Sequence, residues 1–262
     1  MAGISYTNAI PNLSTGLPTI DPFLWTKDRG MIDLGTLGGT IGAANALNNR
    51  GQVIGSSNLA GDQTPPHPFL WDDGKLIDLF TETVGANPVT ANAMNDAGEI
   101  VGQALFSNEF HHAYLWRDGV ATDLGTLPGD SSSEAFAINA RGQVVGRSAA
   151  CDSSTRSFLW ENGSIVDLNS FVPPGSGLQL VDAQSINDHG EIEATSYRPV
   201  ARGTLRVETI CAGTRSCYFH VMRNRKTKRG ARKTLKVLSS RFTTALGWLK
   251  RVRPASRHCT DI

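Results

Sequence analysis

Four aspartates recur in this chain at positions where carboxylates could act as acids, bases or metal ligands. Asp33, Asp78, Asp123 and Asp167 each precede a leucine, one in each of four similar segments. A calcium site needs six or more converging oxygen ligands, and the sequence has no loop dense in aspartate. Short acidic side chains readily accept hydrogen bonds from nearby backbone N–H groups. We therefore expect the four aspartates to stabilise turns and not to perform catalysis.

Histidine and cysteine spacing gives no metal-binding pattern. His67 and the adjacent pair His111 and His112 lie where segments begin, and neighbours in a strand point to opposite faces. The sequence also has no CxxC pair and no Cys/His spacing typical of zinc. We expect no metal and no cofactor. The cysteines are Cys151, in a connection, and Cys211, Cys217 and Cys259, of which Cys211 and Cys217 could pair in an oxidising compartment.

No known catalytic motif is present in the sequence. Gly-x-Ser-x-Gly, HExxH and P-loop patterns are absent. The irregular features are Cys151, the loop at 106–110 and the Pro/Gly-rich insertion at 173–177, and each lies in a connection, where variation is tolerated. We predict no catalytic residue, and the sequence does not specify the binding residues.

Four tryptophans recur with a nearly constant spacing of 46, 45 and 44 residues, and each closes an aromatic-Leu-Trp triplet. Exposed aromatic rings of this kind could line a carbohydrate-binding surface. In a strand, however, side chains alternate, so the first aromatic residue and the tryptophan share one face and the leucine lies on the other. We therefore expect the tryptophans to pack between sheets. They are Trp25, Trp71, Trp116 and Trp160.

The elements that position these side chains form a repeat. A period of 20 to 50 residues indicates a repeat architecture. Asp-Gly or Asn-Gly follows three of the triplets and predicts a type I′ hairpin. An Asn-x-x-Gly block followed by Gln or Glu predicts a second tight turn, and it occurs at 48–53, 95–100, 139–144 and 187–192. A glycine closes the first three blocks, whereas the fourth has Ala194, preceded by Glu193 where the others have Ile or Val.

Four strands in about 45 residues match one blade of a propeller. We therefore expect an all-β, propeller-like fold with about four four-stranded blades and a partial blade. Residues 1–20 are interpreted as a partial repeat, a closing strand and loop, and residues 204–262 as a basic tail that is helical or disordered. The four repeats are expected at 21–66, 67–111, 112–156 and 157–203.

Charge divides the chain sharply. Residues 1–203 carry a net charge of −12, whereas residues 204–262 carry +13. The tail is open to three interpretations: a solvated extension, a basic amphipathic helix for nucleic acid or a membrane surface, or a frame-shifted fifth repeat. No apolar run is long enough for a transmembrane helix. No signal-peptide pattern is visible either, so the sequence as written predicts a cytoplasmic protein.

The recurring blocks resemble the HAF repeat of bacterial proteins described as probable extracellular repeats. The similarity covers about residues 21–196, and the His-Ala-Phe signature stands as His67-Pro68-Phe69 and His112-Ala113-Tyr114. It is altered to Asp21-Pro22-Phe23 and Arg156-Ser157-Phe158. The resemblance implies a propeller-like, often exported protein, and it implies no reaction.

These observations predict a non-catalytic repeat protein that presents a binding or scaffolding surface to a glycan or a protein. One alternative is a hydrolase or lyase with a site at the propeller channel, which an unmatched acidic pair there would favour. Another is a truncated or degraded gene product without function. Nucleic acid or membrane binding would involve the basic tail alone.

Overall fold

The computed structural model describes residues 1–6, 16, 18–106, 110–197, 203–211 and 217–223. Side chains are described for these residues except 63–64, 197, 203–211 and 217–223. The described chain is almost entirely β-strand, with one short helix, α1 (Leu79–Glu82), and one 3-10 turn, η1 (Leu168–Phe171). The strands form four hydrogen-bonded sheets, and none of them closes on itself. The expectation of an all-β fold is confirmed.

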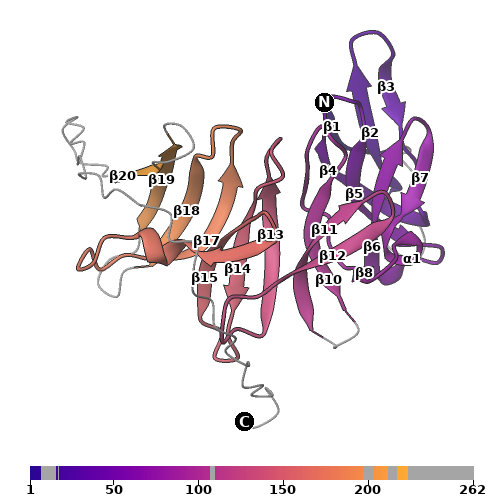
Figure 1. Ribbon diagram of the computed structural model, residues 1–262. Helices are drawn as coiled ribbons and strands as arrows, with labels where there is room; N and C mark the ends of the chain where they lie inside the picture. The colour runs from indigo at the N-terminus through magenta and orange to yellow at the C-terminus, as the bar shows by residue number, and fades with distance from the viewer. Residues whose placement is uncertain (7–15, 17, 107–109, 198–202, 212–216, 224–262) are drawn as a thin grey trace.

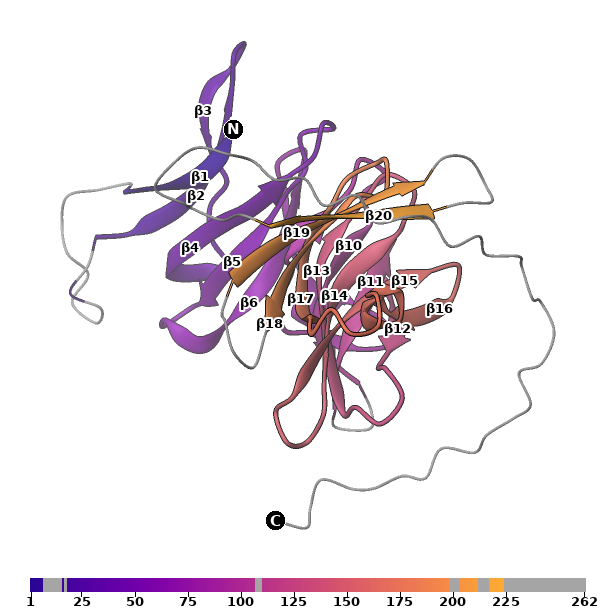
Figure 2. The ribbon, with the colours of Figure 1, turned by 90° about the vertical axis from the view of Figure 1, so that its left-hand side faces the viewer.

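The strands group into five successive layers, which follow one another from the N-terminal end to the C-terminal end of the stack (Figures 1 and 2). Layers 1 and 2 belong to one sheet because a single parallel pair, Ile20 and Ile41, joins them. Layer 1 contains β1 (Ala2–Tyr6), β2 (Ile20–Thr26) and β3 (Gly30–Asp33), and layer 2 contains β4 (Gly38–Leu47), β5 (Val53–Leu59), β6 (Gln63–Asp72) and β7 (Lys75–Asp78).

The other three layers are separate sheets. Layer 3 contains β8 (Asn87–Pro88), β9 (Ala93–Met94), β10 (Ile100–Leu105), β11 (His111–Arg117) and β12 (Val120–Gly125). Layer 4 contains β13 (Ser132–Ile138), β14 (Val144–Ala149), β15 (Thr155–Glu161) and β16 (Ser164–Asp167). Layer 5 contains β17 (Gln179–Ile186), β18 (Ile192–Tyr197), β19 (Gly203–Cys211) and β20 (Cys217–Arg223).

The layers are offset from the sequence repeats by about half a repeat. Layer 4, for example, takes β13 and β14 from the repeat at 112–156, and it takes β16 and most of β15 from the repeat at 157–203. The hairpins explain this offset, because β14 pairs antiparallel with β15 across the repeat boundary. Each layer therefore links two neighbouring repeats.

The two ends of the chain differ from expectation. Strand β1 pairs with β2 and does not close the stack onto layer 5. The prediction of a helical or disordered tail from residue 204 is wrong for its first part. Strand β19 pairs with β18, and β20 pairs with β19, where Cys211 is opposite Cys217. Residues 224–262, including Cys259, lie outside the described residues.

Both predicted turn types are present. Asp73, Asp118 and Asn162 each have a positive φ and precede a glycine with a positive φ, as a type I′ hairpin requires. The Asn-x-x-Gly turns close through a backbone hydrogen bond such as that from Gly142 N to Asn139 O, at 3.0 Å. The glycine that ends each of the first three blocks is needed for close approach, since a Cβ on Gly146 would lie 2.0 Å from the Glu134 carbonyl oxygen.

Four apolar clusters lie between the successive layers and form the core. In layer 3, Tyr114 and Trp116 pack toward layer 2, whereas Leu115 packs toward layer 4. Phe69 and Trp71 likewise face layer 1 while Leu70 faces layer 3. The predicted alternation of the triplet is confirmed. Among the described residues, no helix is both long and apolar enough to cross a membrane.

Candidate functional site

The four repeat aspartates hold the turns that follow them. Each carboxylate accepts a hydrogen bond from the backbone N–H two residues further along the chain. This is the role expected from the sequence. The bonds run from Gly35 N to Asp33 Oδ1 (2.9 Å), Phe80 N to Asp78 Oδ1 (2.9 Å), Gly125 N to Asp123 Oδ1 (2.7 Å) and Asn169 N to Asp167 Oδ1 (2.8 Å).

In layers 2 to 4 the same carboxylate also contacts a basic side chain from the preceding strand. His112 Nδ1 lies 2.8 Å from Asp123 Oδ2. Burial alone would raise the pKa of Asp123, but the hydrogen bonds from His112 and Gly125 outweigh it and lower that pKa. The equivalent contacts are His67 Nδ1 to Asp78 Oδ2 at 2.9 Å and Arg156 Nη1 to Asp167 Oδ2 at 3.0 Å.

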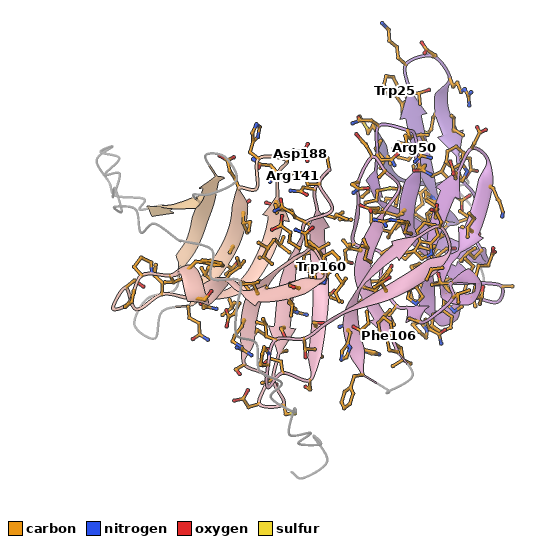
Figure 3. The ribbon with its side chains drawn as sticks, viewed as in Figure 1. Trp25, Arg50, Phe106, Arg141, Trp160 and Asp188 are labelled. Carbon is orange, nitrogen blue, oxygen red and sulfur yellow. The ribbon has the colours of Figure 1, made fainter. Side chains whose placement is uncertain are left out.

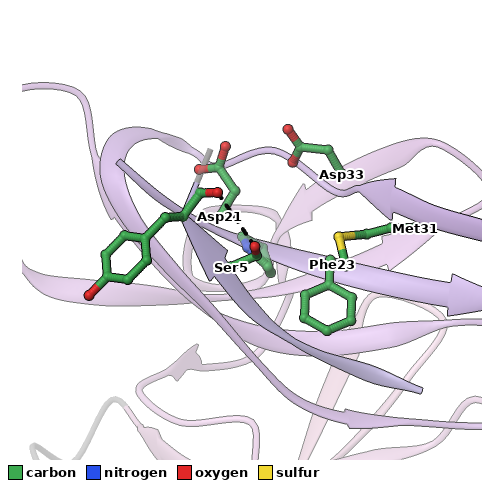
Figure 4. A pocket seen from close by; sticks show the side chains of 7 residues that line it. Ser5, Asp21, Phe23, Met31 and Asp33 are labelled. Atoms are coloured by element: carbon green, nitrogen blue, oxygen red, sulfur yellow. Dashed lines mark hydrogen bonds between the residues drawn. The ribbon is translucent and has the colours of Figure 1, made fainter. Parts of the chain in front are cut away.

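Layer 1 breaks this rule. The position of the histidine or arginine is taken by Asp21, so two carboxylates, Asp21 and Asp33, replace the usual pair of a base and an acid. Both line a hollow of about 310 Å³ on the outer side of the layer. Figure 4 shows the two carboxylates on the same side of this hollow, beside Phe23 and Met31.

The tryptophans divide in the same way. Trp71 and Trp116 are buried between layers, at 8 and 9 % exposure, and Trp160 packs against the cluster between layers 3 and 4. Trp25 is 44 % exposed, because no described layer precedes layer 1. It lies on the outermost strands of the stack (Figure 3) and is paired across the strands with the exposed Met31.

We call the outer side of layer 1 the open face. It is defined by Ser5, Asp21, Phe23, Trp25, Met31 and Asp33. Their register places them on one side of the sheet, because Ser5 is opposite Asp21, Phe23 is opposite Asp33 and Trp25 is opposite Met31. The open face therefore combines an exposed indole, a methionine and two carboxylates.

The opposite end of the stack has a different character. Ile54, Val101 and Val145 are fully buried at one repeat position, each in the cluster shared with the following layer. The fourth repeat has Glu193 there, and its carboxylate lies 3.4 Å from Ser185 Oγ. A charged residue is possible at this position because no described layer follows layer 5. The two ends of the stack are therefore chemically unlike.

A ladder of asparagines connects layers 2 to 5. Asn48 Nδ2 donates to Asn95 O at 3.1 Å, Asn95 Nδ2 to Asn139 O at 3.2 Å, and Asn139 Nδ2 to Asn187 O at 3.0 Å. Two outer contacts accompany it, from Asn49 N to Asp96 Oδ1 and from Ala140 N to Asp188 Oδ1, both 2.8 Å. Figure 3 labels Arg50, Arg141 and Asp188, which lie in three of these Asn-x-x-Gly turns.

A second set of polar contacts connects the ladder to the strand that follows. Each ladder asparagine also donates to the Gln or Glu four residues on, as Asn139 does to Gln143 at 2.7 Å. That side chain then contacts the residue after the tryptophan. The pairs are Gln52 with Asp72, Glu99 with Arg117, and Gln143 with Glu161. The Asn-x-x-Gly-Gln/Glu block is the sequence signal for this network, which the prediction of a turn alone misses.

Within the described residues, the remaining candidates do not form one shared site. His67 and His112 each contact their own aspartate. Cys151 lies in the turn between β14 and β15, and the rings of Phe106 and Phe110 lie 6.0 and 6.4 Å from that of His112. Within the described part of the chain, no three His, Cys, Asp or Glu side chains are grouped so that they could hold a metal ion.

Comparison with known proteins adds no identity. No family model matches the chain, and no curated protein and no solved structure is similar to it.

Proposed function

We propose that this chain is a non-catalytic scaffold, an open arc of β-propeller blades of the HAF repeat type, which presents its open face to a protein partner. The observation that carries this proposal is the exposure of Trp25. The equivalent residues Trp71 and Trp116 are each covered by a preceding layer. The equivalent sheet faces of the other layers are buried, whereas this one leaves an indole 44 % exposed. An exposed aromatic face of this kind favours protein binding.

Charge disfavours closure of the stack onto itself. Closure would bring Glu193 of layer 5 against Phe23, Trp25 and the carboxylates Asp21 and Asp33. Burying the Glu193 carboxylate against apolar rings and beside other carboxylates is costly. The same contact would occur if copies of the chain stacked head to tail. A partner with a neutral or basic apolar surface fits the open face better.

Photo-crosslinking tests this proposal. A photo-reactive amino acid is placed at position 25, and a matched control is placed at Val166, which is also exposed but lies in layer 4. We expect one protein from the native source to crosslink at position 25 alone. After its identification, the purified partner should bind the full chain and lose at least about tenfold in affinity with Trp25→Ala. Equal labelling at both positions would contradict the proposal.

A glycan is the second candidate ligand, and the hollow on the open face favours it. Ser5, Asp21 and Asp33 line the hollow beside Phe23. Carboxylates and hydroxyls can exchange hydrogen bonds with sugar hydroxyls while an aromatic ring packs against the ring of the sugar. Calorimetry with cellohexaose and with chitohexaose, on the wild-type chain and on Asp33→Asn, tests this candidate. Binding that Asp33→Asn abolishes would favour the glycan over the protein partner.

A hydrolase or lyase is less well supported. Asp21 and Asp33 are an acidic pair that the other repeats lack, but such an enzyme is expected to carry its acidic pair at the propeller channel. They lie on the outer side of layer 1 and not at a channel, since the described layers do not close into a ring.

A further inference from the structure

One edge of β1 is unpaired within the described residues. Met1 N donates to Trp25 O at 3.0 Å, and Trp25 N donates to Met1 O at 2.7 Å, so these two residues form a hydrogen-bonded pair. In an antiparallel ladder such pairs alternate, so Gly3 is bonded to β2 in the same way. Ala2 and Ile4 therefore direct their backbone N–H and C=O groups away from β2. No described strand pairs with β1 on that side.

The equivalent edge is occupied in every other layer. In layer 2, Val53 is opposite Trp71 and Gly55 is opposite Phe69, just as Gly3 of β1 is opposite Phe23. Strand β1 is thus the counterpart of β5, and the far edge of β5 carries β4. In the same position β10 carries β8 and β9, β14 carries β13, and β18 carries β17.

The asparagine ladder begins at Asn48 of layer 2, and the backbone carbonyl of Asn48 is an acceptor on the side of layer 1. The carbonyl oxygens of Asn95, Asn139 and Asn187 each accept two hydrogen bonds, one from the glycine of their own turn and one from the preceding asparagine side chain. Within the described residues, the carbonyl of Asn48 accepts from Gly51 N alone, at 3.1 Å. A carbonyl oxygen has two lone pairs, so Asn48 can accept one more donor from the side of layer 1.

We propose that the edge of β1 and the carbonyl of Asn48 together bind an extended segment of a partner protein that ends in an Asn-x-x-Gly turn. The segment adds to β1 as β13 adds to β14, and its asparagine side chain donates to Asn48 O. This inference rests on the proposed scaffold function and names what its partner contributes. Among the described strands, β4, β9, β13 and β17 are each paired in their own layers, so none of them is free to occupy this edge.

Backbone hydrogen bonds provide the affinity in such strand addition, and side chains of alternate residues provide the specificity. The four resident strands indicate the chemistry of the segment: a small residue and then a larger apolar residue come directly before the asparagine. The stretch from Ala135 to Asn139 is the clearest example, with Ala135 and Ile138 buried against the core. A partner with this pattern fits the edge of β1 without adding charge to the open face, which carries Asp21 and Asp33.

A labelled synthetic peptide with the sequence of residues 132–143 of this chain is the probe. Its binding to the purified full chain is followed by fluorescence anisotropy. We expect saturable one-to-one binding that falls at least tenfold with Ile4→Pro, because proline removes an edge N–H without touching the pairing to β2. Ile4→Thr retains the N–H and should bind as the wild type does. Replacing the peptide asparagine by alanine should weaken binding about fivefold to tenfold.

Three outcomes overturn the proposal. The first is no binding of the peptide to a chain whose circular dichroism shows a folded β protein. The second is equal binding to Ile4→Pro and Ile4→Thr. The third is a wild-type chain that sediments as a dimer while Ile4→Pro is a monomer, since β1 would then pair with a second copy. Trp25→Ala should leave peptide binding intact, so failure of the edge is distinguishable from failure of the open face.

Discussion

The side-chain amide of Asn95 donates to the backbone carbonyl oxygen of Asn139, 44 residues further along the chain, at 3.2 Å. The same side chain donates to Glu99, and its oxygen accepts from the backbone N–H groups of Ala97 and Glu99. One buried amide thus organises its own turn and connects two layers. Because buried polar groups without partners are costly, the repeat requires asparagine at this position.

Replacing Asn95 by alanine should therefore lower the free energy of unfolding by about 2–4 kcal/mol, because several buried partners lose a hydrogen bond at once. Urea denaturation followed by circular dichroism measures the effect. Asn187→Ala is the matched control, since Asn187 is exposed and makes the same turn contacts at the end of the ladder. A loss for Asn187→Ala as large as that for Asn95→Ala would contradict a stabilising ladder.

A charge exchange in the second polar network should be tolerated. Layers 2 and 4 pair glutamine with an acid, whereas layer 3 pairs Glu99 with Arg117. Glu99→Gln alone should destabilise the protein by about 1–2 kcal/mol, because it removes a charge-assisted bond. The double variant Glu99→Gln/Arg117→Glu recreates the Gln143–Glu161 pair and should regain most of that loss. Simple addition of the two single effects in a double-mutant cycle would show that the pair is not coupled.

Stability should depend on pH through Glu99. Burial alone would raise the pKa of this carboxyl, but hydrogen bonds from Arg117 and Asn95 outweigh burial and hold the pKa below its ordinary value of 4.5. A lowered pKa in the folded state stabilises the protein above the unfolded value, and this contribution is lost as pH falls through the folded value. The difference in melting temperature between wild type and Glu99→Gln should shrink as pH falls from 6 to about 3. A constant difference would exclude Glu99 as the titrating group.

Much of the fold could be predicted from local chemistry. The Asp-Gly turns, the alternation of Tyr114, Leu115 and Trp116, and the contact of Asp123 with the backbone of its turn each depend on residues close in sequence. The physical rules for hairpins, strands and acidic turn residues act over the same short range. Because the repeat occurs four times, each local inference applies at four positions of the chain.

The rest depends on how the layers stack. The bond from Asn48 to Asn95 exists because one turn lies on the next, and sequence spacing alone did not reveal which groups meet. The acidic pair of Asp21 and Asp33 was visible as an altered His-Ala-Phe signature, but its exposure follows from the position of layer 1 at the end of the stack. Strands β19 and β20 lack the repeat pattern, so their pairing with β18 could not be read from periodicity.

The contrast between Trp25 and Trp116 gives a stability test that involves no ligand. Trp116 packs in the cluster between layers 2 and 3, so Trp116→Ala should cost about 3–5 kcal/mol as it leaves a cavity. Trp25→Ala should change the free energy of unfolding by less than about 1 kcal/mol, because the indole is 44 % exposed on the open face. Chemical denaturation of the two variants beside the wild type measures both values. A large loss for Trp25→Ala would mean that another part of the protein covers the open face, and the proposed binding site would then be an internal contact.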